Sequence, residues 1–467
     1  AALFSEKREV FCSMTASVSI DPAVRREVQS DYFRYLLPTL IGQIAHSFYC
    51  MADVFFVGAA VGSDGLAALN VALPVFTLFS AFSLMVGVGT ATTASILTGQ
   101  GQTQQTNRVF TQSMVLLAVV GLTLTLLTSV FIVPLARVFG ATDRILTEVV
   151  DYMRPINLLA FAYIFSGALG VIIRADGNPR LVMIAGTTGN ICNIVLDYVF
   201  TMKLGMGMFG AGLATILGHC VAVLLYLLHF ALHQNHLHLT RNFFDPAACV
   251  RVLRNGIGSS ILELSAGLIV LLFNIALLRV SGEAAVAIFS VLSNIAYVGK
   301  GVFNGMAQAA QPILSTSYGA GRYDRVRAAN RCAMTAAAIF STVIYLILVL
   351  CAGFIMPVFV EPSLVPMGIR AMRLYFLAFP FTGLNTVMKI VFSQSIKAGK
   401  RIYYLDVLRG VVLISAALML FSVLWGETGV WLALFAAEFT TYAVFTPVRS
   451  KVDRSLNQAP ALRPALR

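Results

Sequence analysis

The sequence has little charge. Only 12% of its 467 residues are Asp, Glu, Lys or Arg, whereas soluble domains carry about 25%. A membrane helix needs about 20 predominantly apolar residues. Four stretches without a charged residue are long enough for one or two such helices each: 65–107, 109–136, 204–240 and 332–360. With 58% hydrophobic residues the chain cannot cover a water-soluble globule of this size. The composition therefore predicts a polytopic α-helical membrane protein.

Other absences exclude further classes. The seven cysteines are scattered without a CxxC pair, so neither a disulfide framework nor a zinc site is expected. The phosphate-binding pattern GxxxxGK[ST] is absent, which argues against nucleotide hydrolysis. No cleavable signal peptide is visible, because the first apolar segment starts near Tyr35. Residues 1–30 are expected to form a disordered tail, in which Met14 is a candidate start.

The net charge of +12 could suggest nucleic-acid binding, but in a membrane protein it fits the positive-inside bias. We therefore expect no nucleic-acid partner. The apolar segments number about twelve, and an even number places both termini on one side. That side would carry 23 Lys and Arg residues against seven on the other, so both termini are expected to be cytoplasmic. The segments are 34–57, 66–97, 109–133, 152–173, 181–201, 209–232, 252–279, 284–316, 331–356, 373–396, 402–424 and 429–447.

The chain repeats itself at a spacing of 220 residues. Gly99 and Gly101 match Gly319 and Gly321 at that spacing. This predicts two lobes of six helices, 31–232 and 251–448, in the same orientation around a central cavity. Residues 233–250 would be a hinge-like cytoplasmic connecting loop and 449–467 a basic cytoplasmic tail.

Four motifs resemble one family of transporters. They are Pro38-Thr-Leu-Ile-Gly-Gln43 with Met51-Ala-Asp-Val-Phe-Phe-Val-Gly58, Ile173-Arg-Ala-Asp-Gly-Asn-Pro179, Asn193-Ile-Val-Leu-Asp197 with Gly210-Ala-Gly-Leu-Ala-Thr215, and Gln308-Ala-Ala-Gln-Pro-Ile-Leu-Ser-Thr-Ser-Tyr-Gly-Ala-Gly321. In this order they are similar to the multidrug and toxic compound extrusion (MATE) transporters, most of all to the DinF-like and MepA-like branch. The resemblance implies a multi-pass inner-membrane exporter of amphipathic, often cationic compounds, driven by inward proton or sodium flow without a cofactor.

Five polar residues of the first half share one depth. Asp53 and Asp197 lie near the ends of outward-running segments, Asn193 is one turn below Asp197, and Thr215 and Tyr152 lie near the starts of inward-running ones. Carboxylate, amide and hydroxyl oxygens suit a sodium ion or a shared proton. The alternative is that helix packing satisfies each group separately.

The resemblance assigns roles to these residues. Asp53, Asn193, Asp197 and Thr215 match the cation-linked site of the family's N-terminal lobe, and Tyr152 matches a member of its hydrogen-bond network. Pro38 matches a proline tied to the bending of the first helix. A sodium ion at Asp53, Asn193, Asp197 and Thr215 is the only bound metal that we expect. The histidines at 229, 233, 236 and 238 have a spacing that could bind a metal, but they lie at a helix end, where interfacial histidines are common.

The second half departs from the sodium-type pattern. Glu263 occupies a position where many family members carry a cation-binding glutamate, whereas the tenth segment has Lys389 and no carboxylate. Lysines inside a membrane are rare, and Glu263 is the candidate partner for Lys389. Lys300 either has a partner, snorkels to the interface or faces an aqueous cavity.

Rival functions stay open at this point. A flippase for a lipid-linked sugar would use the same two lobes. A membrane-embedded lipid-modifying enzyme would need a clustered metal or phosphate site, which the sequence does not show, and a channel gains nothing from buried titratable groups in one lobe only. The expected partners are the lipid bilayer and small amphipathic molecules, and the protein is expected to act as a monomer. The residues of a promiscuous cavity do not name its substrate.

Overall fold

The computed structural model describes residues 21–241, 243–389 and 412–458, and within these ranges all regular structure is helical. The first half consists of α2 (Pro22–Ala60), α3 (Ser63–Gly99), α4 (Thr103–Val130), α5 (Ile132–Val138), α6 (Leu146–Leu158), α7 (Ala160–Ala175), α8 (Pro179–Asp197), the π-helix η1 (Tyr198–Lys203) and α9 (Gly207–Ala231). The second half consists of α10 (Pro246–Gly319), α11 (Tyr323–Leu350), α12 (Ala352–Phe359), the 3₁₀-helix η2 (Pro362–Leu364), α13 (Val365–Phe376), α14 (Phe379–Lys389) and α16 (Ile414–Gln458).

The described residues contain ten helices long and apolar enough to span a membrane, or eleven if α6 and α7, which meet at a bend of 60°, form one span. This confirms the all-α polytopic class, although twelve segments were expected. The difference lies in α16, which joins the expected segments 402–424 and 429–447 across Gly426. Part of the former segment, 402–411, lies outside the described residues.

Helix ends shift three expected boundaries. Residues 22–30 are helical and do not belong to a disordered tail, because the Asp21 side chain accepts the Ala23 N–H at 2.9 Å and Pro22 opens α2. Similarly, Asp245 caps α10 so that helix begins at Pro246 inside the expected loop 233–250. Helix α16 continues to Gln458, inside the expected tail 449–467, whose last residues, 459–467, lie outside the described ranges.

The backbone repeats at the spacing found in the sequence. Helices α4 and α11 both have 28 residues and begin 220 positions apart. The breaks at Gly62 (φ 81°) and Gly282 (φ 72°) have the same separation. Glycine is favoured at both because a side chain is strained at positive φ. The chain is therefore built as two copies of one helical unit.

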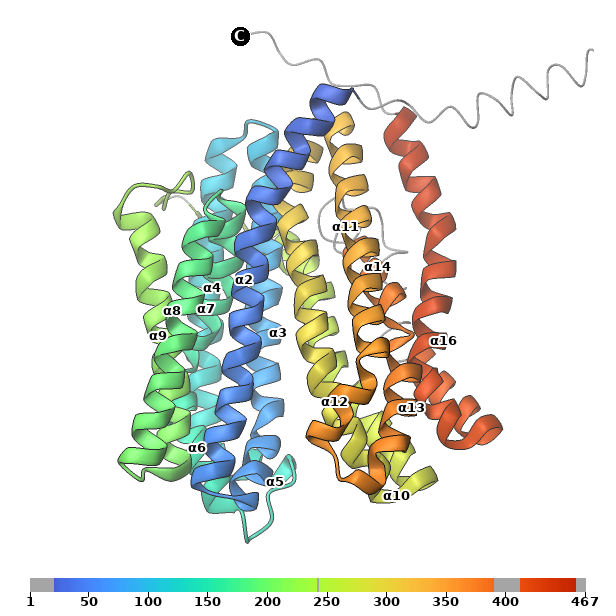
Figure 1. The fold of residues 1–467 in the computed structure, drawn as a ribbon. Helices are drawn as coiled ribbons and strands as arrows, with labels where there is room; N and C mark the ends of the chain where they lie inside the picture. The colour runs from blue at the N-terminus through green and yellow to red at the C-terminus, as the bar shows by residue number, and fades with distance from the viewer. Residues whose placement is uncertain (1–20, 242, 390–411, 459–467) are drawn as a thin grey trace, which may run out of the picture.

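The two copies form two lobes (Figure 1). Helices α3 to α9 gather in one lobe and α11 to α16 in the other, while α2 and the long broken α10 run between them. The start of α2 and the end of α16 lie at the same end of the bundle, at the top of Figure 1, which we call the terminal face. The opposite end is called the far face.

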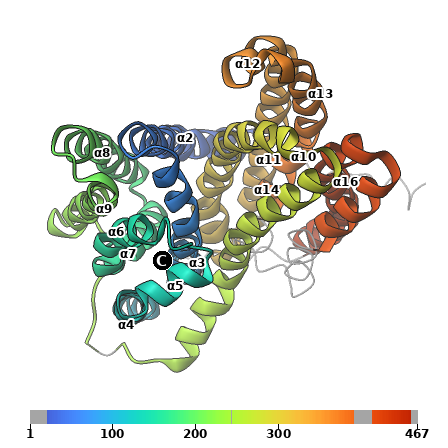
Figure 2. The ribbon, with the colours of Figure 1, turned by 90° about the horizontal axis from the view of Figure 1, so that it is seen from below.

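The first helix of each lobe begins in the core of the other lobe. Val28 and Tyr32 of α2 belong to the hydrophobic core formed by α10, α11, α13, α14 and α16, whereas Val57 of the same helix belongs to the core of the first lobe. Symmetrically, Ala248 and Val252 of α10 pack in the first lobe's core. Figure 2 shows α10 crossing from α4 towards α11. These crossings tie the two lobes together.

The lobes pack closely near the terminal face. A Cβ atom on Gly99 of α3 would lie 2.2 Å from the carbonyl oxygen of Thr316, and one on Gly319 of α10 would lie 2.1 Å from that of Ile96. Only glycine allows backbones to approach this closely. Next to this contact, the Gln311 amide donates to the Thr92 hydroxyl at 3.0 Å.

The connecting segment lies along α4 and is bound to it. The backbone N–H groups of His238, Thr240 and Asp245 donate to the side chains of Asn107, Thr111 and Gln112 of α4, at 3.0, 3.0 and 3.2 Å respectively. The expected hinge is therefore fastened to the first lobe over most of its length.

Candidate coupling site and cavity

The structure brings the five polar residues of the first lobe together. The Tyr152 hydroxyl of α6 donates to Oδ2 of Asp53 on α2 at 3.3 Å. The Asn193 amide of α8 donates to the Thr215 hydroxyl of α9 at 3.5 Å. Asp197 lies close enough to Asp53 and Tyr152 to interact with both electrostatically. Four helices that are distant in sequence thus converge on one polar cluster, which we call the N-lobe cluster.

The N-lobe cluster is buried and incompletely hydrogen bonded. Asp197 is fully buried and Asp53 is 7% exposed. Within the described part of the chain, both carboxylate oxygens of Asp197, Oδ1 of Asp53 and Oδ1 of Asn193 have no hydrogen-bond donor. Carboxylates within membrane segments are costly and call for a partner. Two such groups with unused oxygens suit a proton or a small hard cation.

Close backbone contacts position these side chains. A Cβ on Gly212 would lie 2.2 Å from the carbonyl oxygen of Tyr152, so α9 touches α6 at the hydroxyl donor. Gly189 and Gly218 bring α8 and α9 together beside Asn193, since a Cβ on Gly218 would lie 3.0 Å from the Asn193 Cβ. Small residues at such crossings are typical of membrane helices.

Asp197 is the last residue of α8, where the helix changes to the π-helix η1. The Thr201 hydroxyl donates to the Asp197 carbonyl oxygen at 2.6 Å across this change. π-Helical turns are rare and occur frequently at functional sites. The change in helical geometry is a local feature that the hydrophobic pattern did not predict.

A cavity of about 490 Å³ lies between the lobes. Side chains of α2, α7, α8 and α9 line it on one side and those of α10, α14 and α16 on the other. Asn193 and Thr215 belong to this lining, whereas Asp53 and Asp197 lie behind it. The amide and the hydroxyl are therefore the members of the N-lobe cluster that face the cavity.

Pro38 also lines the cavity and lies inside α2. Because proline has no N–H, the carbonyl of Arg34 lacks its helical donor. The hydroxyl of the next residue, Thr39, donates to the Tyr35 carbonyl oxygen at 2.7 Å. A hydroxyl beside a helix-interior proline is a usual way to accommodate it within a membrane.

All three candidates of the second half reach the cavity. Glu263 and Lys300 of α10 and Lys389 of α14 line it, and Lys389 is only 2% exposed. None of the ion pairs recorded between described residues joins Glu263 to Lys389, so their coupling stays a prediction. Glu438 of α16 lines the cavity as well, and its Oε2 accepts the Asn385 amide at 2.7 Å.

Sequence reasoning missed three further cavity residues. His46 and His219 line the first lobe's wall, and Nδ1 of His219 lies 3.0 Å from the Ser166 hydroxyl. Arg174 of α7, which belongs to the motif 173–179, faces the cavity and donates to the side-chain oxygen of Gln308 on α10 at 2.6 Å. For Arg174, the available signal was a single charged residue in the otherwise uncharged helix α7.

The structure places the histidines after α9 in a different role. His229 is fully buried, and its Nε2 lies 2.8 Å from a carboxylate oxygen of Asp176. The backbone N–H of His236 donates to the same carboxylate at 3.0 Å. In the described residues, no three His, Cys, Asp or Glu side chains are grouped as metal ligands. These contacts tie the connecting segment to the end of α7.

The family model described as MatE matches the chain twice, over residues 38–199 and 257–419. The two matches correspond to the two lobes and together cover most of the sequence. The chain therefore belongs to the MatE family of membrane transporters.

Curated relatives are similar over most of their length. The multidrug export protein MepA of Staphylococcus haemolyticus is 22% identical over 406 residues, which are 86% of this chain and 89% of that protein. The FAD transporter of Shewanella oneidensis is 25% identical over 423 residues, 85% of this chain and 89% of that protein. Both relatives are named for transport.

Solved structures share the fold. A crystal structure of MATE in complex with MaD3S superimposes with a TM-score of 0.86 at 25% identity, covering 92% of this chain and 97% of the other. An outward-facing multidrug resistance MATE family transporter superimposes with a TM-score of 0.87 at 24% identity, again over 92% and 97% of the two chains. The protein is thus a multi-pass membrane protein of the efflux-transporter class, with the expected two-lobe architecture.

Proposed function

We propose that this protein is a secondary active multidrug exporter that moves amphipathic compounds, cationic ones included, outward against an inward flow of protons or sodium ions. The N-lobe cluster would bind the coupling ion and the cavity between the lobes would bind the substrate. The name of the MepA relative supports multidrug export.

The observation that carries this proposal is the pair of buried carboxylates with unused oxygens, Asp53 and Asp197, behind a cavity wall that contains Asn193 and Thr215. Two carboxylates in a low-dielectric layer do not readily carry two negative charges at once, so a proton or a sodium ion must accompany them. An ion bound there reaches the cavity past the amide and the hydroxyl.

The contacts between the lobes support transport by alternating access. Close contacts near the terminal face, such as Gly99 with Thr316, close the cavity at that end. If the terminal face is cytoplasmic, as the Lys and Arg distribution predicts, this conformation faces outward. Rocking of the lobes would open the other side, with Pro38 as the point where α2 bends.

The protein would act as a monomer in the inner membrane, with both termini in the cytoplasm and no cofactor. A lipid-linked substrate would make the same scaffold a flippase, and a lipid-modifying activity would make it an enzyme. The relatives named above are transporters, which favours transport of small molecules over chemistry on lipids.

The test is ethidium efflux from proteoliposomes in which a proton gradient and a sodium gradient are imposed separately. We expect at least one gradient to drive uphill movement of ethidium by the wild type, and neither to do so for Asp53→Asn. Asp143→Asn is the matched control, because Asp143 is an exposed carboxylate in the loop between α5 and α6. Wild-type rates in Asp53→Asn would disprove the coupling role of the N-lobe cluster. Absence of gradient-driven ethidium movement in the wild type would disprove multidrug antiport.

A further inference from the structure

Among the residues that the structure describes, the cavity has more basic than acidic side chains. Arg174, Lys300 and Lys389 line it together with Glu263 and Glu438. Three formal positive charges therefore face two negative ones, and protonation of either glutamate would enlarge the excess. A cavity with low-dielectric walls and an excess of one sign concentrates ligands of the opposite sign.

Arg174 is buried in the cavity wall with a neutral hydrogen-bond acceptor. It is 8% exposed, and its Nη1 donates to a neutral group, the Gln308 carbonyl oxygen, at 2.6 Å. Its Nε is buried without an acceptor among the residues that the structure describes. No ion pair recorded in the described ranges includes Arg174. A buried guanidinium without a carboxylate is costly and calls for an anion.

Neither Asp176 nor Asp197 of the first lobe can serve as the anion that Arg174 calls for. Asp176, two residues after Arg174, is held by His229 at 2.8 Å and by the backbone of His236. Asp197 ends α8, which starts at Pro179 on the same side of the bundle as Arg174. α8 has 19 residues, so Asp197 lies 18 residue steps beyond Pro179, a rise of about 27 Å at 1.5 Å per residue. The N-lobe cluster is thus too far away to neutralise Arg174.

We propose that Arg174 binds the carboxylate or phosphate group of amphipathic compounds, so that the cavity accepts anion-bearing substrates in addition to cationic ones. A guanidinium presents two parallel N–H donors that match either group. The apolar part of the ligand would lie against the lining side chains of Val171, Val182 and Ile269. As a substrate site, this assignment rests on the proposed export function.

Binding at Arg174 would also act on the contact between the lobes. Arg174 belongs to the first lobe and Gln308 to α10 near the terminal face. A ligand oxygen that replaces the Gln308 carbonyl as acceptor removes one hydrogen bond that holds the lobes together there. Anion binding and opening towards the terminal face are therefore linked.

The experiment measures dye binding by fluorescence anisotropy in phosphatidylcholine nanodiscs without any ion gradient. Fluorescein and rhodamine 123 share a xanthene skeleton, but the first carries a carboxylate and the second is a cationic ester. We expect Arg174→Gln to weaken fluorescein binding about tenfold or more, since a charge-assisted bond is lost, and to leave rhodamine 123 binding nearly unchanged. Arg180→Gln, an exposed arginine at the start of α8, is the matched control and should bind both dyes as the wild type does.

Equal fluorescein binding by the wild type and Arg174→Gln would overturn the proposal, as would absence of fluorescein binding by the wild type. If Arg174→Gln fails size-exclusion chromatography, Arg174→Lys keeps the charge but loses the paired donors, and intermediate binding is expected; wild-type binding in that variant would overturn the proposal equally. Competition by added phosphatidylglycerol would identify a lipid headgroup as the anion, and no competition a soluble amphipath. Since no gradient is present, binding can persist where ion-driven efflux fails, which separates this inference from the proposed function.

Discussion

The two lobes share a backbone plan but differ in what they bury. In the first lobe, Asp53 lies in a polar cluster with Tyr152 and Asp197. Its counterpart in the second lobe, 220 positions later, is Phe273, which is fully buried and stacks on Phe289 with ring centroids 5.0 Å apart. The same helix position therefore holds a carboxylate in one lobe and an aromatic core residue in the other.

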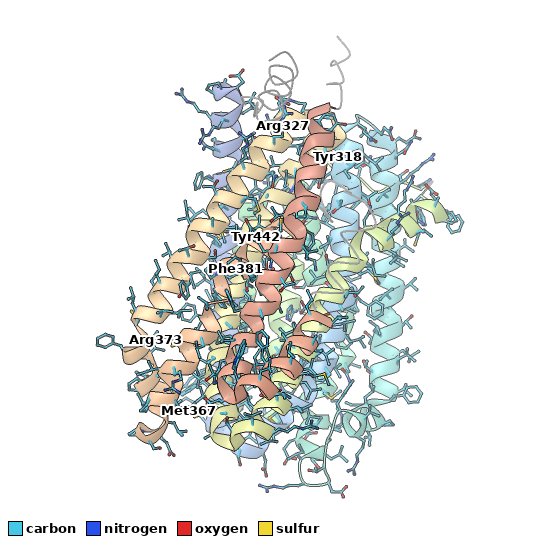
Figure 3. All side chains as sticks on the ribbon, turned by 90° about the vertical axis from the view of Figure 1, so that its right-hand side faces the viewer. Tyr318, Arg327, Met367, Arg373, Phe381 and Tyr442 are labelled. Carbon is cyan, nitrogen blue, oxygen red and sulfur yellow. The ribbon has the colours of Figure 1, made fainter. Side chains whose placement is uncertain are left out.

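The other positions of this layer differ in the same way. Thr215 corresponds to Phe435 at an offset of 220 residues, and Asp197 corresponds to the apolar stretch 416–419 at offsets of 219 to 222. Phe435 packs on Phe381 of α14, which also contacts Tyr442 of α16. Figure 3 shows Phe381 and Tyr442 from the side of the second lobe. At these equivalent positions the second lobe thus has aromatic or aliphatic side chains where the first lobe has polar ones.

On the cavity walls, in contrast, the second lobe carries more charged side chains than the first among the residues that the structure describes. Glu263 and Lys300 of the second lobe correspond to Gln43 and Ser80 of the first at the spacing of 220, and all four line the cavity. The first lobe thus keeps its carboxylates behind its wall, whereas the second lobe places charges on its wall. We infer that ion coupling belongs mainly to the first lobe and that the second lobe contributes more charge to substrate recognition.

The largest effect is expected from Asp197→Asn. Asparagine keeps the size of the side chain but cannot exchange a proton or supply charge to sodium, so ethidium export should fall to the level of empty liposomes while the protein stays folded. Efflux and size-exclusion profiles measure the two outcomes. Export at wild-type rates would remove the first lobe from coupling and with it the contrast between the lobes.

Placing a carboxylate at the equivalent position of the second lobe should damage the fold without creating coupling. Phe273→Asp removes a buried aromatic ring, which costs about 3–5 kcal/mol, and adds an acidic group without a partner in the aromatic core. We expect a much lower thermal midpoint, measured by heating followed by size-exclusion chromatography. Phe273→Leu controls for loss of the ring. A stable Phe273→Asp protein with altered ion dependence would mean that the two layers are interchangeable.

A smaller effect is expected from the charged wall of the second lobe. Lys389→Met and Glu263→Gln should each alter substrate range or coupling. If the two residues form a buried pair, either change leaves an uncompensated charge that costs about 3–5 kcal/mol. If the two residues are coupled, the double variant should be little worse than either single one. Ethidium efflux is measured in the wild type, the two single variants and the double variant, which form a double-mutant cycle. Strictly additive defects would show that Lys389 and Glu263 are not partners.

Neutral members of the N-lobe cluster should matter less than the carboxylates. Thr215→Ala and Asn193→Ala each remove hydrogen bonds worth about 0.5–1.5 kcal/mol, which corresponds to a change of about two- to tenfold in the ion concentration that gives half-maximal efflux. Thr77→Ala on the exposed side of α3 serves as the control, since its hydroxyl only donates to the Leu73 carbonyl oxygen. Complete loss of export in Thr215→Ala would give the hydroxyl a larger role than a neutral ligand.

The orientation shared by the two lobes can be tested without loss of activity. In a variant free of the seven native cysteines, single cysteines at the exposed positions Ser63 and Glu361 should react with an impermeant thiol reagent from outside. Those at Gln104 and Arg322 should react only from the cytoplasmic side. The reverse pattern would invert the topology, and a mixed pattern within one face would contradict the parallel orientation of the repeats.

The sequence alone determined the class and the architecture. Long uncharged runs can only be membrane helices, and a spacing of 220 residues repeated in glycines predicts two copies of one unit. It also placed Asp53, Asn193, Asp197, Thr215 and Tyr152 at one depth, because helix length and direction fix how far each residue lies from a membrane surface.

Only the tertiary structure decided which of these groups touch and what faces the cavity. Helical periodicity does not say that Tyr152 donates to Asp53 while Asn193 donates to Thr215. Nor does it say that Arg174, near the end of α7, faces a cavity between the lobes. These contacts depend on how helices distant in sequence cross, and the crossings are set by glycine contacts such as Gly189 with Gly218. The sequence of one helix does not determine where another helix packs against it, so these contacts were known only from the tertiary structure.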